Sequence, residues 1–216
     1  MNLQISRTHF PVTVLGPGRR AGIWVQGCGV GCKGCVSKDT WNRAGGSAMP
    51  VATILSWSLA CIASGADGVT ISGGEPFEQP DGLAALLDGL IAARAAGGRD
   101  FDILCYSGLK LARLRRLHPA ILAKLDAIIP EPFVEALPDG AIWRGSVNQP
   151  LIALSERGRR IYAPYRDGKA TNSAGLQVSV EGDQIWMVGI PRRGDLARLE
   201  AKARAAGLQL GEASWM

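Results

Sequence analysis

Three cysteines lie close together near the start of the chain. Cys28, Cys32 and Cys35 form a C-x3-C-x2-C pattern, and three glycines lie between them. Thiolates are soft ligands that suit zinc or iron–sulfur clusters. Glycines let a loop curl around a compact group and offer backbone N–H groups to its sulfurs. The pattern therefore predicts a site for zinc or an iron–sulfur cluster.

The number of ligands narrows this prediction. An ordinary [4Fe–4S] cluster has four cysteine ligands, whereas this loop supplies three. Neither Cys61 nor Cys105 has the local spacing to complete the set, and both are expected to be small buried hydrophobic residues. Three ligands leave one iron open to a small-molecule chelator. The alternatives are a zinc site completed by His9 or His118, and a redox or chance grouping of cysteines.

A second motif follows a predicted strand directly. It reads Ser72-Gly73-Gly74-Glu75-Pro76, and the cysteine loop also follows a predicted strand. In a parallel α/β fold, ligands bind beyond the carboxyl ends of strands, so both motifs are expected on the same face. The two glycines would let a ligand approach the backbone. Taken alone, the same residues are typical of a tight turn before a helix.

The composition excludes several classes of protein. The chain has 216 residues, of which 47% are apolar and 20% charged, which suits one domain with a full core. No apolar run approaches the length of a membrane helix, and residues 1–10 have no signal-peptide core, so a cytoplasmic protein is expected. A net charge of +5 is too weak to indicate nucleic acid by itself. Five cysteines, an odd number, argue against a disulfide framework.

Strands and helices are expected to alternate along the first part of the chain. The apolar spacing predicts helices over 51–64, 81–96 and 109–125, the last interrupted at His118-Pro119. Short apolar runs predict strands over 22–26, 68–72, 101–106 and 127–129. This order favours βαβ units and a parallel sheet.

The expected fold class is therefore α/β. The alternation weakens after about residue 135, which favours a partial, TIM-like barrel of parallel strands over a full eight-fold one. Residues 177–181 and 184–190 alternate and predict a hairpin with its turn at 181–183, and residues 195–206 predict a helix. We expect a barrel core over 1–157 and a hairpin–helix appendage over 158–216, both within one domain.

The two motifs together resemble the signatures of the radical S-adenosylmethionine superfamily in order and spacing. A closer similarity is to the activating proteins of anaerobic ribonucleotide reductase, relatives of pyruvate formate-lyase activating enzyme, over roughly residues 8–155. The similar segments are Gly16-Pro17-Gly18-Arg19, 27–42, Thr70-Ile71-Ser72 through Pro76, Tyr106-Ser107-Gly108 and 143–149, the last expected to be a loop.

The resemblance implies two cofactors and their ligands. Cys28, Cys32 and Cys35 would ligate a [4Fe–4S] cluster, whose fourth iron would be chelated by the methionyl group of S-adenosylmethionine. The amino end of that group would be bound by Gly73, Gly74 and Glu75. Gly34 and Val36 would line the site of the adenine ring. Ser107 would contact the ribose or the methionyl part.

The chemistry implied is an oxidoreductase reaction without a side-chain acid or base. The reduced cluster would cleave S-adenosylmethionine to methionine and a 5′-deoxyadenosyl radical, which abstracts hydrogen from the substrate. In activating enzymes the hydrogen comes from a glycine of a partner glycyl radical enzyme. The cofactors carry out such chemistry, while the protein binds and orients them and excludes water. The low number of histidines in the chain, two, is therefore compatible with this reaction.

The chain departs from the family pattern at three places. Gly34 and Val36 stand where aromatic residues are common, so the backbone would hold the adenine more than stacking would. Pro130-Glu131 replaces an Asp-Gly ahead of Pro132-Phe133, and the tail after residue 158 is longer than in the shortest members. These departures leave open a radical enzyme that modifies a peptide or a small molecule. A non-catalytic zinc or iron–sulfur protein is a further alternative.

Basic residues suggest how an electron donor would dock. Arg113, Arg115 and Arg116 fall on a predicted helix, and arginines at 157, 159 and 160 fall in a predicted turn. They are typical of a solvated surface, or they would steer an acidic partner such as a flavodoxin or ferredoxin. The same patches would serve a tRNA-modifying enzyme, but no aromatic-interleaved basic segment supports nucleic acid. No membrane partner is expected.

Overall fold

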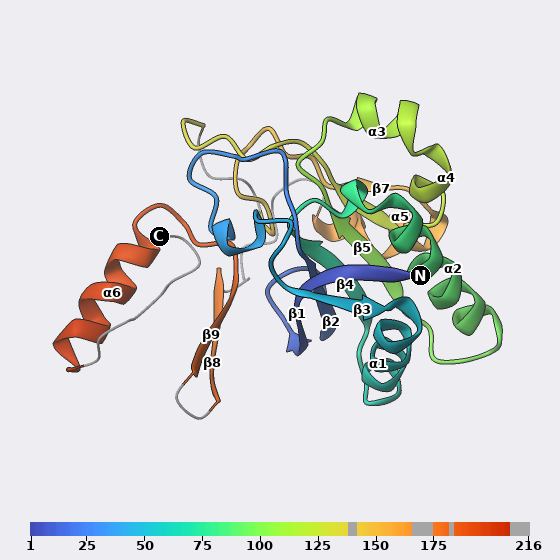
Figure 1. The fold of residues 1–216 in the computed structure, drawn as a ribbon, viewed down its shortest axis with the longest axis horizontal. Coiled ribbons are helices and arrows are strands. Elements are labelled where there is room, and N and C mark those ends of the chain that lie inside the picture. Colours follow the sequence, from blue (N-terminus) through green and yellow to red (C-terminus); the bar gives the residue numbers. More distant parts are fainter. Residues whose placement is uncertain (138–141, 166–174, 182–183, 208–216) are drawn as a thin grey trace.

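The computed structural model describes residues 1–137, 142–165, 175–181 and 184–207 of the chain. Its centre is a seven-stranded sheet in the order β3-β1-β2-β4-β5-β6-β7, and a separate two-stranded hairpin pairs β8 with β9. In Figure 1, helices α1 to α4 lie to one side of the sheet and the hairpin with α6 lies to the other. The expected mixed α/β fold with a C-terminal hairpin and helix is confirmed.

The strands and helices have the following bounds. The large sheet contains β1 (Asn2–Val12), β2 (Arg20–Val25), β3 (Ser47–Pro50), β4 (Gly68–Gly73), β5 (Asp102–Tyr106), β6 (Ala127–Ile129) and β7 (Ile152–Ala153). The hairpin is β8 (Leu176–Glu181) with β9 (Gln184–Gly189). The helices are α1 (Val51–Ala63), α2 (Pro80–Ala95), α3 (Leu111–Leu117), α4 (Pro119–Leu122), α5 (Glu156–Tyr162) and α6 (Asp195–Ala205).

The sheet is parallel at its centre and antiparallel at its edges. Strands β2, β4, β5 and β6 pair in parallel. The expected parallel sheet is thus found at the centre, and strands that were not predicted extend it at its edges: β1 pairs antiparallel with β2 and with β3, and β7 pairs antiparallel with β6. Strand β1 was not predicted. Its buried residues Leu3 and Ile5 are followed by the polar residues Arg7 and His9, which weakens the alternation of apolar and polar residues that marks a strand.

The other expected elements agree with the structure to within a few residues, including the interruption of the third helix at His118. The expected turn at Arg157, Arg159 and Arg160 is wrong, because these residues belong to α5. Ser155 caps that helix by accepting a hydrogen bond from the Gly158 N–H at 2.9 Å, a standard helix start. The central residues of the expected hairpin turn, 182–183, lie outside the described part of the chain.

Side chains along the central strands alternate between two buried faces. Ile23 and Ile103 pack with α1 and α2 on one face, while their neighbours Trp24 and Leu104 belong to separate apolar clusters on the other. Successive side chains of a strand point to opposite faces, so a strand covered on both sides reads as a continuous apolar run. This burial explains why β2 and β4 were recognisable from sequence.

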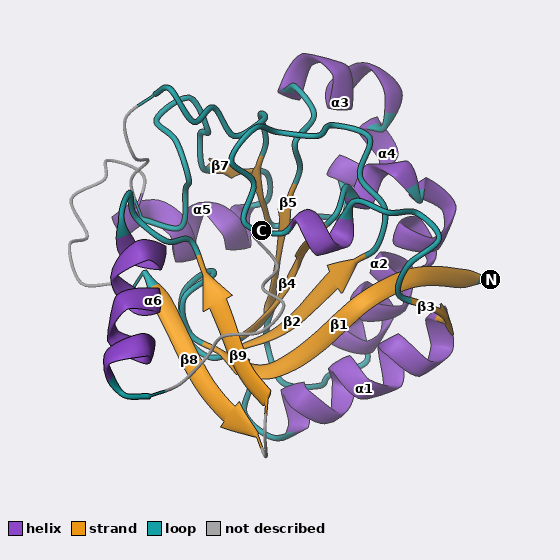
Figure 2. Ribbon diagram, turned by 60° about the vertical axis from the view of Figure 1, so that its left-hand side comes forward, coloured by secondary structure: helices purple, strands orange, loops and turns teal. Residues whose placement is uncertain are grey.

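The hairpin covers the sheet face that the helices α1 to α4 leave free. Val188 of β9 is buried against Val12, Val14 and Leu15 and against Trp24 of β2. Figure 2 shows the hairpin running in front of β1 and β2, with α6 beside it. The appendage therefore contacts the core directly. Among the described residues, no helix is both long and apolar enough to cross a bilayer.

A buried ion pair ties the amino ends of the central strands together. The Arg20 guanidinium of β2 is fully buried and donates two hydrogen bonds, at 2.9 and 2.8 Å, to the Asp102 carboxylate of β5. It also donates to Thr70 of β4 at 2.5 Å, and the Tyr162 hydroxyl of α5 donates to Asp102. The network lies at the opposite strand ends from the two sequence motifs.

Removing one partner of this pair should destabilise the fold strongly. In Asp102→Asn the Arg20 charge stays buried without its counter-ion, so we expect the free energy of unfolding to fall by about 3–5 kcal/mol. The matched control is Asp88→Asn, since Asp88 pairs with Lys124 but is 62% exposed, and its loss should be below about 1 kcal/mol. Denaturant titration under anaerobic conditions measures both, and equal effects would contradict the assignment.

Candidate active site

The cysteine loop starts directly at the carboxyl end of β2. The Gly27 N–H donates to the Thr40 carbonyl at 2.7 Å, and the Cys28 N–H donates to the Trp41 carbonyl at 3.2 Å. These hydrogen bonds close residues 27–41 into one loop that extends from the sheet. The loop is thus held at its base while the residues between its ends, which include Cys32 and Cys35, lie away from the strand. This placement agrees with the expected position of the loop at a strand end.

Backbone N–H groups surround the three cysteine sulfurs, which are half-buried. The Ser37 N–H donates to the Cys35 sulfur at 3.4 Å. Burial raises the pKa of Cys28, and the N–H groups of Gly31 and Val30 oppose that shift. Burial likewise raises the pKa of Cys32, against an opposing backbone hydrogen bond from Phe133, and the Cys28 and Cys35 thiols add to the increase. The three thiols are therefore close enough to interact electrostatically.

This donor set fits an iron–sulfur cluster better than a single metal ion. Three thiols with N–H groups aimed at their sulfurs are the ligand chemistry that such clusters use. Each cysteine that ligates a cluster binds a different iron. The cysteine sulfurs around a cluster therefore lie further apart than the sulfurs that ligate a single ion. Among the described side chains, no group of three or more His, Cys, Asp and Glu is placed to hold a single metal ion.

The remaining cysteines have the structural role expected of them. Cys61 on α1 and Cys105 on β5 are both buried in the main apolar cluster between the sheet and its helices. Burial raises the pKa of both thiols, which keeps them protonated and unreactive. Both residues therefore pack in the core as expected, while the ligand role of the other three cysteines stays a prediction.

The glycine turn after β4 lies against the start of the cysteine loop. The Gly74 N–H donates to the Val25 carbonyl, and the Glu75 N–H donates to the Gly27 carbonyl, both at 2.8 Å. A side chain at Gly74 would meet the Gly27 carbonyl oxygen at 2.2 Å, so this approach requires glycine. Gly73 is the register partner of Val25. The structure thus brings the two sequence motifs together, as expected.

Glu75 is fully buried, and its carboxylate is occupied by its own chain. It accepts hydrogen bonds from the Phe77 N–H at 3.0 Å, the Ser107 hydroxyl at 2.9 Å and the Gly108 N–H at 2.7 Å. Ser107 follows β5, so this side chain joins the turn after β4 to the turn after β5. Glu75 and Ser107 are therefore adjacent, and the role of Glu75 at the methionyl amino end stays a prediction.

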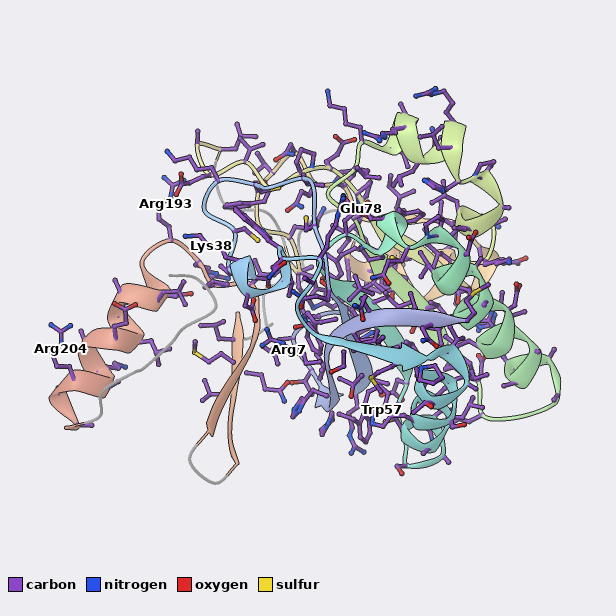
Figure 3. The ribbon with its side chains drawn as sticks, in the orientation of Figure 1. Arg7, Lys38, Trp57, Glu78, Arg193 and Arg204 are labelled. Atoms are coloured by element: carbon purple, nitrogen blue, oxygen red, sulfur yellow. The ribbon has the colours of Figure 1, made fainter. Side chains whose placement is uncertain are left out.

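Two further residues position the loop and were missed by the sequence analysis. Glu78 accepts a hydrogen bond from the Gly29 N–H at 2.8 Å and two from the Arg43 guanidinium at 3.1 and 2.7 Å. Figure 3 labels Glu78 near the cysteine loop. Glu78 lies three residues after Glu75 within one short 3-10 turn, Pro76–Glu78, so one turn contacts both the loop and the end of β5. Such contacts depend on the tertiary fold, so the spacing of residues in the sequence does not indicate them.

A cavity of about 220 Å³ opens beside the cysteine loop. The predicted adenine-site residues Gly34 and Val36 line it, whereas Gly73, Gly74 and Glu75 do not. Strand-end residues contribute Trp24, Ser72 and Tyr106, of which the last two directly precede the predicted site residues. The remaining lining residues come from the loops after β6 and from the C-terminal appendage, as follows: Phe133, Gly145, Gln149, Leu176, Met187 to Pro191 and Leu196, together with Arg7, Leu15, Cys35 and Ser37.

The segment around Pro130-Glu131 has an unusual backbone. Glu131 has a φ of 84°, a left-handed conformation that glycine adopts most easily. Its carboxylate accepts a hydrogen bond from the Leu111 N–H at 3.0 Å, and its carbonyl accepts one from Gln149 at 3.0 Å. The left-handed backbone of Glu131 is therefore held by contacts to α3 and to the expected loop at 143–149, whose Gln149 also lines the cavity.

The geometry defines a class of protein: a thiolate loop and a glycine turn joined at the carboxyl ends of parallel strands, beside a cavity. The sequence model of the family described as "4Fe-4S single cluster domain" matches residues 14–152. Because this covers more than half of the chain, the protein belongs to that iron–sulfur family.

Several relatives carry the same description, "Anaerobic ribonucleoside-triphosphate reductase-activating protein". The protein from Vibrio cholerae is 32% identical over 145 residues, which is 65% of this chain and 92% of the relative. The protein from Escherichia coli K12 is 31% identical over 147 residues, 65% and 93% of the two chains. The protein from Enterobacteria phage T4 is 30% identical over 138 residues, 64% and 86%.

A likeness to a solved structure is weaker. The crystal structure of QueE from Escherichia coli aligns with a TM-score of 0.39 and 23% identity over 50% of this chain and 53% of the other. The sequence relatives confirm the resemblance to activating enzymes of the radical S-adenosylmethionine type. The protein is an enzyme of this type, with a [4Fe–4S] cluster and S-adenosylmethionine as its cofactors.

The cysteines provide the first test of the site. We expect Cys28→Ala, Cys32→Ala and Cys35→Ala each to lose most of the bound iron after anaerobic reconstitution, because each removes one of three ligands. Cys61→Ala is the matched control and should keep wild-type iron content. Iron and sulfide assays with visible absorption measure the outcome, and full iron content in the Cys35 variant would contradict the ligand assignment.

Glu75 provides a test by pH. Burial raises its pKa from 4.5 to about 7, although hydrogen bonds from Phe77, Ser107 and Gly108 oppose the shift. A carboxyl whose pKa is higher in the folded state stabilises the fold fully below its unfolded pKa and loses that contribution as the pH rises through about 7. Between about pH 5 and about pH 8, the unfolding free energy of wild type should therefore fall by roughly 2–3 kcal/mol relative to Glu75→Gln.

The comparison uses the protein without cofactors, titrated with denaturant at several pH values. The amide of Glu75→Gln also changes hydrogen bonding to Ser107 and Gly108, but that offset is independent of pH. The slope with pH is the diagnostic quantity. Parallel curves for the wild type and the variant would show that the Glu75 carboxyl does not titrate in this range.

Proposed function

We propose that this enzyme activates a glycyl radical enzyme, and that its partner is an anaerobic ribonucleoside-triphosphate reductase. The observation that carries the proposal is the junction of the cysteine loop with the glycine turn, in a chain that aligns with activating proteins over 92–93% of their length. The hydrogen donor would be a glycine of the partner.

The proposed roles of this chain's residues follow from their places in the fold. Cys28, Cys32 and Cys35 would hold three irons of the cluster, and the backbone at Gly73 and Gly74 would bind the methionyl amino end of S-adenosylmethionine. When bound, the two cofactors supply one-electron reductive cleavage of the sulfonium and abstraction of a hydrogen atom from the substrate.

The residues that face the cavity would orient the nucleoside part of that cofactor. Val36 and Gly34 line the cavity beside Cys35, and apolar Trp24 and Leu15 line it too. Gly34 has a φ of +76°, and a side chain there would meet the Glu135 carboxylate at 2.8 Å, so its backbone stays close to the cavity without a side chain. Apolar walls of this kind exclude water, which protects a reactive centre from side reactions. Ser107, fixed by Glu75, would contact the ribose or methionyl part from the end of β5.

The site's position on the sheet supports the proposal of a partial barrel. Helices α1 to α4 cover one face, and the cavity residues Trp24 and Tyr106 lie on the other. In a barrel the helices lie outside and ligands bind at the carboxyl ends of the strands. The strands that we assign to this incomplete barrel are β2, β4, β5 and β6. The core over 1–157 and the appendage over 158–216 are proposed as one domain.

An electron donor is also part of the proposal. Arg113, Arg115 and Arg116 are exposed on α3, close in sequence to the Ser107-Gly108 turn. Arg157 instead pairs with Asp100 at 2.8 Å, so α5 offers less free charge. We assign the docking of an acidic flavodoxin or ferredoxin to the α3 side, through long-range attraction. A cytoplasmic location would keep the cysteines reduced until the cluster is inserted.

A second candidate function is radical modification of another peptide or a small molecule. Its support is specific: Glu131 occupies a glycine-type backbone position next to the cavity loops, and about a third of this chain has no counterpart in the aligned relatives. Either feature would change the substrate while leaving the cofactor site intact.

The deciding experiment follows hydrogen transfer. The reduced, reconstituted enzyme is incubated with S-adenosylmethionine and a reductase deuterated at glycine. We expect a glycyl radical signal in electron paramagnetic resonance and deuterium in the 5′-deoxyadenosine product, while a partner lacking the radical glycine gives neither. Cofactor cleavage without a glycyl radical or deuterium transfer would refute activation of this partner and favour the second candidate.

A further inference from the structure

The C-terminal appendage builds part of the cavity beside the cysteine loop. Leu176 of β8, Met187 of β9 and Leu196 of α6 all line it, together with the connecting residues Ile190 and Pro191. The family match ends at residue 152, so this wall lies outside the region that defines the family. The relatives are aligned over most of their own length with about two thirds of this chain. The wall therefore belongs to a part of this chain that the family match does not cover.

The hairpin is fixed to the core on the side of β1. The Gln177 side chain accepts hydrogen bonds from the Thr13 N–H at 3.0 Å and from its hydroxyl at 3.2 Å, and donates to the Pro11 carbonyl at 2.7 Å. Val188 is buried in the apolar cluster around Trp24. These contacts hold β8 and β9 in one register against the sheet.

A second attachment lies on the side of the cysteine loop. The Arg193 guanidinium, just before α6, donates to the Glu135 carbonyl at 2.9 Å and to the Leu137 carbonyl at 3.1 Å. The Glu135 carboxylate in turn pairs with Lys33 at 3.3 Å, within the cysteine loop. Figure 3 shows Arg193 at the turn leading into α6, beside these loops. Residues 187–196 are thus held between two anchored points, and Met187 to Pro191 and Leu196 line the cavity as a wall.

The chemistry of the cavity indicates the kind of molecule that this wall contacts. Arg7 is the one charged residue among the described residues that line it, and its guanidinium is paired with Asp39. Phosphate or polyanion recognition needs several cationic donors, and the residues of this wall that line the cavity include none. The lining side chains of the wall are apolar, which suits a neutral polypeptide segment with small or apolar side chains.

We infer that the hairpin β8–β9 with residues 190–196 is a recognition wall that contacts the partner's polypeptide segment from which hydrogen is taken. This inference rests on the proposed function, because it takes the hydrogen donor to be part of a protein. It assigns partner selectivity to Met187 and Leu196, on two different elements, rather than to the cysteine loop. The segment enters between this wall and the loops at 133 and 145–149.

The test compares bulky substitutions on the wall with one at an exposed residue of α6. Met187→Trp and Leu196→Trp place a large ring in the cavity, whereas Ala197→Trp alters α6 at an exposed residue that does not line the cavity. Reconstituted proteins are compared for the dissociation constant of the reductase, without S-adenosylmethionine, and for glycyl radical formed per cofactor cleaved. Wall variants should weaken binding about tenfold or more and lower that ratio, whereas Ala197→Trp should match wild type.

Each outcome has a distinct meaning. If the wild type neither binds the reductase nor forms a glycyl radical on it, the proposed function is wrong. The reductase segment is then also wrong as the ligand of the recognition wall. If the wild type does both and the wall variants do so equally well, the recognition wall alone is wrong. The recognition wall is also overturned if Ala197→Trp is as defective as Met187→Trp, or if binding is unchanged while cofactor cleavage falls in proportion to radical yield.

Discussion

The site depends on one close contact between two backbone segments. The Gly74 and Glu75 N–H groups donate to the carbonyls of Val25 and Gly27, so the turn after β4 lies directly on the start of the cysteine loop. There is no room for a side chain at Gly74, because the Gly27 carbonyl would be 2.2 Å away. Parallel pairing of β2 with β4 brings the two strand ends to the same edge, and the glycine lets them touch.

Neighbouring side chains extend this contact in two directions. Glu75 reaches the end of β5 through Ser107 and Gly108, and Glu78 reaches the cysteine loop through Gly29 and is braced by Arg43. Both carboxylates belong to the turn that follows Gly74. A displacement of this turn would therefore move the loop of ligands and the end of β5 together, which is how a scaffold holds a cofactor site to a narrow range of geometry.

Much of this arrangement could be predicted from the sequence, for physical reasons. Strands β2 and β4 are short, largely buried stretches rich in Val, Ile and Trp, and the two motifs follow them directly. The antiparallel edges were missed, because β1 has polar residues where alternation would show it and β7 spans only two residues. The helical setting of Arg157 was missed because its start depends on a single cap at Ser155.

Long-range contacts limited the prediction of the site itself. Nothing near Glu78 in the sequence indicates that it receives the Gly29 N–H from 49 positions away. The same limit applies to the cavity, whose lining residues run from Arg7 to Leu196. The burial of the Glu75 carboxylate was equally invisible, since two of its three donors, Ser107 and Gly108, come from a segment more than thirty positions away.

The central claim is that three thiolates and a glycine turn form a site for reductive chemistry on S-adenosylmethionine. The most direct test is product analysis by mass spectrometry after anaerobic reconstitution, chemical reduction and incubation with that cofactor. Methionine and 5′-deoxyadenosine in equal amounts, from a protein that binds four irons per cluster, is the predicted result. One zinc ion per chain and no cleavage would contradict the account.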